Sequence, residues 1–128
     1  MKVTSDWQGL NVDLSKLTEH VESFFKSKGL YAKRILCEGG FKIFVSQNGK
    51  SRDICAEILG DSRNFQVNFV LDDRSGSASM LGSVFSVFFG GGLLLKTLKS
   101  KELFEKIEPE FWIYIDKVIE ELNAVKDR

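Results

Sequence analysis

The chain has 128 residues, of which 43% are hydrophobic, so one domain can bury a core without disulfides or a structural metal. Its 18 Lys and Arg residues balance 18 Asp and Glu residues, which argues against nucleic acid or an anionic membrane surface as an electrostatic partner. Two cysteines and one histidine make neither a disulfide framework nor a zinc ligand set, so no metal or other cofactor is predicted. Residues 1–13 lack the apolar run and cleavage site of a secretory signal, and we expect a cytoplasmic protein.

The N-terminal part of the chain predicts an arm followed by a helix. Residues 1–12 show no clear periodicity, and we expect Trp7 and Leu10 to tuck against the body of the domain. An amphipathic helix is predicted next, capped by Asp13 and ended by Gly29. Its apolar residues recur at helical spacing at Leu14, Leu17, Val21, Phe24 and Phe25.

Four segments with period-two alternation follow and predict a four-stranded antiparallel meander with one apolar face. The dipeptide Asn48-Gly49, after FKIFVSQ, is a strong hairpin signal. A two-residue loop at this dipeptide places Val45 opposite Arg52 and Ile43 opposite Ile54. In the last strand, FQVNFVL, the apolar face carries Phe65, Val67, Phe69 and Leu71.

The first hairpin of the meander admits two registers. A three-residue loop over residues 38–40 sets Cys37 opposite Phe41, whereas a two-residue loop turns the first strand over. We prefer the longer loop, because it places Tyr31, Ile35 and Cys37 on the apolar face. Cys55 then lies on the opposite face, so the two thiols are predicted to be separate and free.

The segment SGSASMLGSVFSVFFGGGLLLK, which begins at Ser75, has no charge before Lys96. As a helix, residues 75–95 would be long enough to cross about 30 Å of hydrocarbon. Glycines and serines dilute its apolar content, and Gly82, Ser86 and Gly90 would form a groove for close packing on one helix face. The segment is open to four interpretations: a buried helix on the sheet, a fifth strand, an exposed apolar patch, or a membrane segment.

Two C-terminal helices are predicted after this segment. The first is short and contains Leu98, Leu103, Phe104 and Ile107. Pro109 suits the first position of the second helix, because that position needs no backbone N–H. The second helix carries one apolar stripe, formed by Phe111, Trp112, Ile115, Val118, Ile119 and Leu122.

The sequence gives no convergent set of catalytic residues, and we expect the protein not to be an enzyme. His20 has no second histidine, and neither cysteine has a predicted base beside it. The segment KTLKSK at residues 96–101, with Lys26, Lys28, Lys33 and Arg34, could form a basic patch for phosphate, and with Tyr31 nearby it could bind single-stranded nucleic acid. The zero net charge argues against that nucleic-acid partner. The outer face of the sheet is too mixed for an RNA-binding platform, with Lys42, Phe44, Asp53, Cys55, Glu57, Gln66, Asn68 and Val70.

We therefore predict a single α+β domain over residues 1–128, in which the N-terminal helix, the segment and the C-terminal helices pack on one face of the sheet. The predicted function is a non-catalytic module for protein interaction or self-association, as a homo-oligomer or with a protein partner. The residues assigned to this contact are Gly82, Phe85, Ser86, Phe88, Phe89, Gly90 and Trp112. One alternative is a carrier of a small apolar, lipid-like molecule, in a pocket lined by Phe65, Phe69, Phe85 and Phe88. A second alternative is membrane association through residues 75–95.

Overall fold

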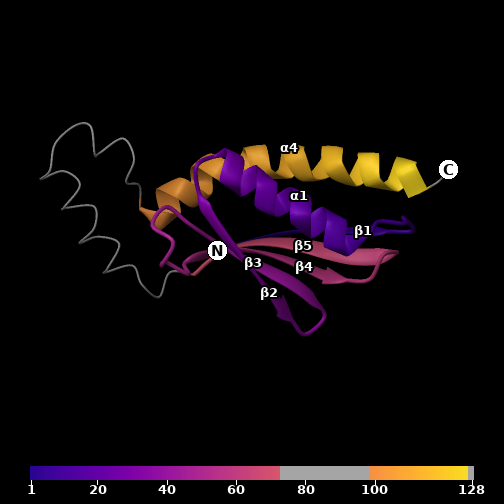
Figure 1. Ribbon diagram of the computed structural model, residues 1–128, viewed down its shortest axis with the longest axis horizontal. Helices are drawn as coiled ribbons and strands as arrows, with labels where there is room; N and C mark the ends of the chain where they lie inside the picture. Colours follow the sequence, from indigo (N-terminus) through magenta and orange to yellow (C-terminus); the bar gives the residue numbers. More distant parts are fainter. Residues whose placement is uncertain (73–98, 127–128) are drawn as a thin grey trace, which may run out of the picture.

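The computed structural model describes residues 1–72 and 99–126 and shows an α+β fold with two layers. In this part of the chain, five strands form one antiparallel sheet in the order β1-β5-β4-β3-β2, and two helices cover one face of it (Figure 1). The helix α1 lies over β2 and β3, α4 lies over β5, and the two helices contact each other. The elements are β1 (Lys2–Gln8), α1 (Leu14–Ser27), β2 (Tyr31–Cys37), β3 (Gly40–Ser46), β4 (Ile54–Gly60), β5 (Asn64–Leu71) and α4 (Ser100–Lys126).

The helix α1 begins and ends where the sequence predicts. Asp13 Oδ1 accepts hydrogen bonds from the backbone N–H groups of Ser15 and Lys16 at 2.9 and 3.3 Å, which satisfies two donors that a helix start leaves free. After the helix, Gly29 adopts φ 80° and its N–H donates to the carbonyl of Lys26. One stripe of α1 is buried, formed by Leu17, Thr18, Val21, Phe24 and Phe25.

The N-terminal residues form a strand rather than the predicted arm. β1 pairs with β5 from Lys2 opposite Val70 to Gln8 opposite Asn64, which makes β1 one edge of a five-stranded sheet. Trp7 does pack against the core, with its ring stacked on Phe65 at a centroid distance of 5.4 Å. The alternation of apolar and polar residues in β1 is weak in the sequence, because the polar residue Ser5 occupies a position that faces the core.

The β3–β4 connection is longer than the predicted two-residue loop. Val45 lies opposite Ile54, so the register differs by two residues from the predicted one. The reason is the side chain of Asn48, whose Oδ1 accepts from the N–H groups of Lys50 and Ser51 and stabilises a wider turn. Because the difference is an even number, every side chain keeps its predicted face.

The predicted register of the first hairpin is wrong. Glu38 and Gly39 form a two-residue loop, with Gly39 at φ 88°, and this loop turns β2 over. The inward position goes to Arg34, whose Nε lies 3.2 Å from a carboxylate oxygen of Glu22 on α1. β2 tolerates this arrangement because it is the second edge of the sheet. The residues that consequently face away from the helices are Tyr31, Lys33, Ile35 and Cys37.

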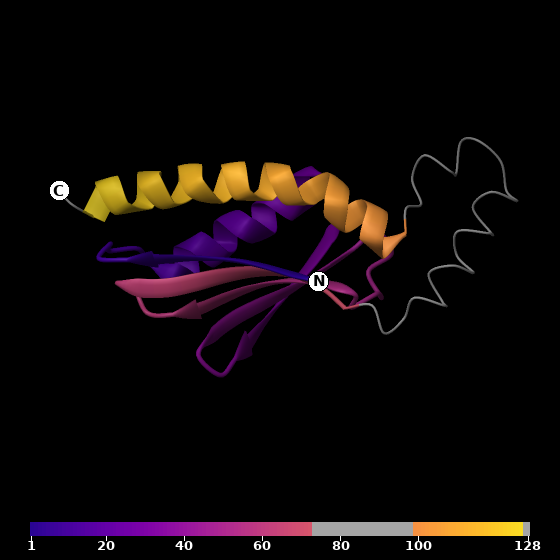
Figure 2. The ribbon, with the colours of Figure 1, turned by 180° about the vertical axis from the view of Figure 1, so that it is seen from behind.

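The C-terminal helix is continuous through Pro109, where the sequence predicts a new helix. Pro109 lies inside α4, and Figure 2 shows the first turns of α4 inclined to the rest of the helix. A bend suffices here because the apolar stripe continues on one side of the helix across the proline. The buried members of that stripe are Leu103, Phe104, Ile107, Phe111, Ile115, Val118 and Ile119.

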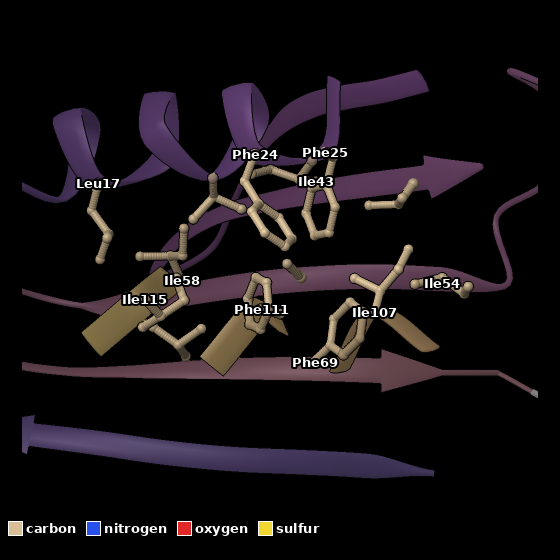
Figure 3. Close-up of a cluster of buried hydrophobic side chains, with 14 of the residues drawn as sticks. Leu17, Phe24, Phe25, Ile43, Ile54, Ile58, Phe69, Ile107, Phe111 and Ile115 are labelled. Carbon is tan, nitrogen blue, oxygen red and sulfur yellow. The ribbon is translucent and has the colours of Figure 1, made fainter. Parts of the chain in front are cut away.

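The core lies between the helices and the sheet and is built around four phenylalanines. The ring of Phe69 on β5 stacks on Phe104 and Phe111 of α4 at centroid distances of 4.5 and 4.7 Å. Phe25 of α1 stacks on Phe111 at 5.6 Å, so the cluster joins both helices to the sheet (Figure 3). Aliphatic side chains such as Leu17, Ile43, Ile54 and Ile58 close it on either side.

Candidate functional site

The outer face of the sheet, opposite the helices, is not covered by any element in the part of the chain that the structure describes (Figures 1 and 2). Strand pairing confirms most of the predicted composition of its centre, which is Lys42, Phe44, Cys55, Glu57, Gln66, Asn68 and Val70. Asp53, also predicted on this face, precedes β4, and its Oδ2 accepts a hydrogen bond from Ser100 at the start of α4. Polar side chains on β1 continue this face toward one edge, and Tyr31 and Lys33 continue it toward the other.

A polar network crosses four strands of the outer face. Asn68 is fully buried at its centre: its Oδ1 accepts from Thr4 Oγ1 and Gln66 Nε2, both at 2.8 Å. Its Nδ2 donates to Glu57 Oε1 at 3.0 Å, and Glu57 in turn lies 3.5 Å from Lys42 Nζ. Because these groups satisfy one another, the network holds the strands together and leaves no free nucleophile or base.

A pocket of 270 Å³ lies beside this network, at the end of the sheet where β2 begins and β3 ends. It is formed by two strands and the β3–β4 loop, which contribute aromatic, basic and hydroxyl side chains. The residues that line it are Tyr31, Lys33, Phe44, Ser46, Gly49, Lys50, Ser51 and Arg52. Of the basic residues considered for a phosphate patch, Lys33 lines this pocket, whereas Arg34 pairs with Glu22.

Lys50 and Arg52 were not among the site residues predicted from the sequence. The signal for them was present in the run QNGKSRD, in which a turn dipeptide is followed by two basic residues. Their relation to Lys33 depends on the register of the β2–β3 hairpin, which places Lys33 opposite Phe44. The predicted register turned Lys33 to the face that packs against the helices, so these basic residues were not recognised as neighbours.

The edge strand β2 carries an unusual amount of exposed apolar surface. Tyr31, Ile35 and Leu36 are 62%, 38% and 80% exposed, and they are three of the five large hydrophobic side chains exposed in the described part of the chain. The other edge strand, β1, exposes Lys2 and Asp6 on its outer side, as edges that avoid aggregation commonly do. The two edges therefore differ in kind, and β2 is the one suited to contact with another protein.

Both thiols are free, as predicted, although Cys37 lies on the outer face and not on the apolar face. Cys55 is 8% exposed, and burial, followed by the nearby Glu57 carboxylate, raises the pKa of its thiol from 9.0 to about 11. His20 is on α1, on the other side of the sheet from both cysteines. His20 therefore cannot act as a base for Cys55, and the nearby carboxylate of Glu57 disfavours the thiolate form.

This environment predicts selective alkylation. Near pH 8, iodoacetamide should modify the half-buried Cys37 while Cys55 stays unmodified, since a rise of two pKa units lowers its thiolate fraction about 100-fold. Peptide mass spectrometry of timed samples measures both rates. In urea, where the burial is lost, the two rates should become similar; equal rates in the folded protein would contradict the burial of Cys55.

Most of the predicted contact residues lie outside the described part of the chain. Gly82, Phe85, Ser86, Phe88, Phe89 and Gly90 belong to residues 73–98, as do the four interpretations of residues 75–95. Trp112 is described: it is half-buried against the core, and its buried indole N–H has no hydrogen-bond partner there. Phe65 and Phe69, from the predicted apolar-ligand pocket, are 3% and 0% exposed within the packed core.

The two ends of the undescribed stretch 73–98 both reach Asp53. The backbone N–H of Asp72 donates to the carbonyl of Asp53 at 2.7 Å, and Ser100 Oγ donates to its Oδ2 at 2.7 Å. The chain therefore leaves and rejoins the described body at one place, beside the β3–β4 loop.

The described residues hold neither a cluster of metal-ligating side chains nor a helix that could span a membrane. Residues 1–72 and 99–126 contain no group of three or more His, Cys, Asp or Glu side chains arranged to hold a metal ion. Neither α1 nor α4 is both long and apolar enough to cross a membrane.

Comparison with known proteins gave no further indication of function. The chain matches no family model, and no match was found among curated proteins or among solved structures.

Proposed function

We propose that the protein is a non-catalytic self-association module whose exposed edge strand β2 pairs with β2 of a second copy. The observation that supports this proposal is the exposed apolar surface of β2, formed by Tyr31, Ile35 and Leu36. An edge strand offers unpaired backbone donors and acceptors, and apolar side chains on it add a favourable burial term when a second strand docks. The β2–β3 hairpin extends away from the helix layer, so a second copy can approach it (Figure 1).

Charge selects the register of such a pairing. In an antiparallel pair related by a twofold axis, one residue of β2 lies opposite itself. Centring on Lys33 or Arg34 places like charges opposite each other, which is destabilising. Centring on Ile35 places Ile35 against its own copy, Lys33 against Cys37 and Arg34 against Leu36, with no like charges opposed. Centring on Leu36 also opposes no like charges, but it pairs only residues 35–37 of β2 with each other, whereas centring on Ile35 pairs residues 33–37. We therefore expect the axis at Ile35.

Replacement of Leu36 by lysine tests the proposal. Light scattering on a size-exclusion column should give a dimer for the native chain and a monomer for the variant. The loss of two buried leucines, one from each copy, should cost about 3 kcal/mol or more, which weakens the dimer at least ~100-fold. Ile113 is 72% exposed on α4, so Ile113→Lys is a matched control that should remain dimeric. A native monomer at high concentration, or dissociation by the control substitution, would show that β2 is not the contact.

The register is tested by cross-linking. With Cys37 and Cys55 both replaced by serine, Ile35→Cys should form a disulfide-linked dimer under mild oxidation, because residue 35 lies opposite itself across the axis. In the native sequence Cys37 lies opposite Lys33 and should give no such dimer. A strong Cys37-linked dimer would contradict this register and would indicate that the twofold axis lies nearer the hairpin turn.

A further inference from the structure

The described residues that line the pocket between β2, β3 and the β3–β4 loop carry positive charge and include no carboxylate. Three of its lining side chains, Lys33, Lys50 and Arg52, are cationic, and none of them forms an ion pair with a described residue. Two described carboxylates on the neighbouring part of the chain have partners of their own: Glu57 contacts Lys42 and Asn68, and Asp53 accepts from Ser100. A protein of zero net charge that collects three cations, none paired with a described carboxylate, at one concave place offers a local site for an anion.

The hydroxyl groups of the pocket are also arranged as donors. Ser46 Oγ accepts from the N–H of Gly49, and Ser51 Oγ accepts from the N–H of Asp53, so each hydroxyl proton is left to donate. No lining side chain is an obligate acceptor. A ligand with several acceptor oxygens and a high charge fits this lining, and phosphate groups have both properties.

The key cation is held in place before any ligand arrives. The guanidinium of Arg52 lies 5.3 Å from the ring centroid of Phe44, so an aromatic platform limits its movement. The loop itself is fixed by the side-chain hydrogen bonds of Asn48 and Ser46, and Gly49 lies against the ring of Tyr31. A planar guanidinium held in this way can donate two parallel hydrogen bonds to one phosphate.

From this geometry we propose that the pocket binds a small molecule through a diphosphate or a similar multiply charged phosphate group. Its volume of 270 Å³ is at the small end for ligand sites, which favours a compact ligand. Three cations match the charge of a diphosphate better than that of a monophosphate. Tyr31 belongs both to this pocket and to the proposed self-association surface, but edge pairing of β2 leaves the outer face of the sheet uncovered, so the pocket stays open in the dimer.

Calorimetric titration of the full chain with pyrophosphate at low ionic strength tests the proposal. We expect saturable binding that weakens as salt is added, with orthophosphate binding more weakly. Arg52→Gln should lower the affinity about tenfold or more, because it removes charge-assisted hydrogen bonds. Arg52→Lys keeps the positive charge but loses the planar guanidinium that donates two parallel hydrogen bonds, so its affinity should lie between those of the native chain and Arg52→Gln. Lys50→Gln should weaken binding several-fold.

The controls separate this site from general charge effects and from the other proposal. Lys117 is exposed on α4, so Lys117→Gln removes a cation away from the pocket and should leave the affinity unchanged. The Leu36→Lys variant should bind pyrophosphate as the native chain does, whatever its oligomeric state. Lys50 is exposed in the loop, so its replacement tests the site even if an Arg52 variant is less stable.

Three outcomes would overturn the proposal. They are the absence of saturable pyrophosphate binding, an equal loss of affinity in Lys117→Gln, and binding of a single-stranded oligonucleotide that pyrophosphate does not displace. The last result would assign the cations to a nucleic-acid surface instead of a small-ligand pocket.

Discussion

Replacement of Phe69 by alanine is expected to lower the free energy of unfolding by about 3–5 kcal/mol. Phe69 is fully buried on β5, and its ring stacks on Phe104 and Phe111 of α4. Removal of the ring leaves a cavity between the sheet and α4 and also removes three ring contacts, with Phe25, Phe104 and Phe111. Since a domain of this kind is stabilised by about 5–15 kcal/mol, such a loss brings the protein close to unfolding.

Urea denaturation followed by circular dichroism measures this loss. Phe44→Ala is a matched control, because Phe44 is half-buried on the outer face of the same sheet and its removal creates no enclosed cavity. We expect the control to lose less than half as much stability as Phe69→Ala. Similar losses for the two variants would mean that the aromatic cluster is not the centre of the core.

The elements that the sequence predicts correctly are those whose signals are local. For α1, helical spacing, the Asp13 cap and the terminal Gly29 all lie within one short stretch. For β5, four apolar residues alternate with polar ones because one face is buried along the whole strand. In both cases the residues within the segment are enough to predict its secondary structure and its buried face.

The features that the sequence did not reveal depend on pairing between distant residues. β1 is a strand because β5 is available beside it, far along the chain, and its own pattern is interrupted by Ser5. The face to which each β2 side chain points is set by a two-residue loop at residues 38–39. The sequence of residues 38–40 is compatible with either a two-residue or a three-residue loop. The two-residue loop is the one found in the fold, where it allows Arg34 to form an ion pair with Glu22 of α1.

The same distinction applies to the candidate sites. The exposure of Ile35 and Leu36 follows from the position of β2 at the sheet edge, and periodicity places such residues in a core. The basic pocket requires Lys33 and Arg52 to lie on one face at one end of the sheet, which only the register provides. The contact predicted for residues 82–90 falls outside the described residues and stays a prediction.

The second large effect is expected at Gly60, where β4 ends. Gly60 adopts φ 118°, and a Cβ at this position would meet the backbone carbonyl oxygen of Asn64. Gly60→Ala therefore combines backbone strain of about 1–2 kcal/mol with overpacking of about 1–3 kcal/mol. We expect a loss of roughly 2–5 kcal/mol in the free energy of unfolding, because the neighbouring atoms are backbone and cannot swing aside.

Gly29 is the control that separates the two causes. It also has a positive φ, 80°, but a Cβ there would meet nothing within 4 Å, so Gly29→Ala should cost only the strain of about 1 kcal/mol. Urea denaturation of both variants gives the difference, which is the cost of the close approach between Gly60 and Asn64. Equal losses would show that the β4–β5 turn can relax. In that case the tight turn would not hold the register that places Phe65, Val67 and Phe69 beneath the helices.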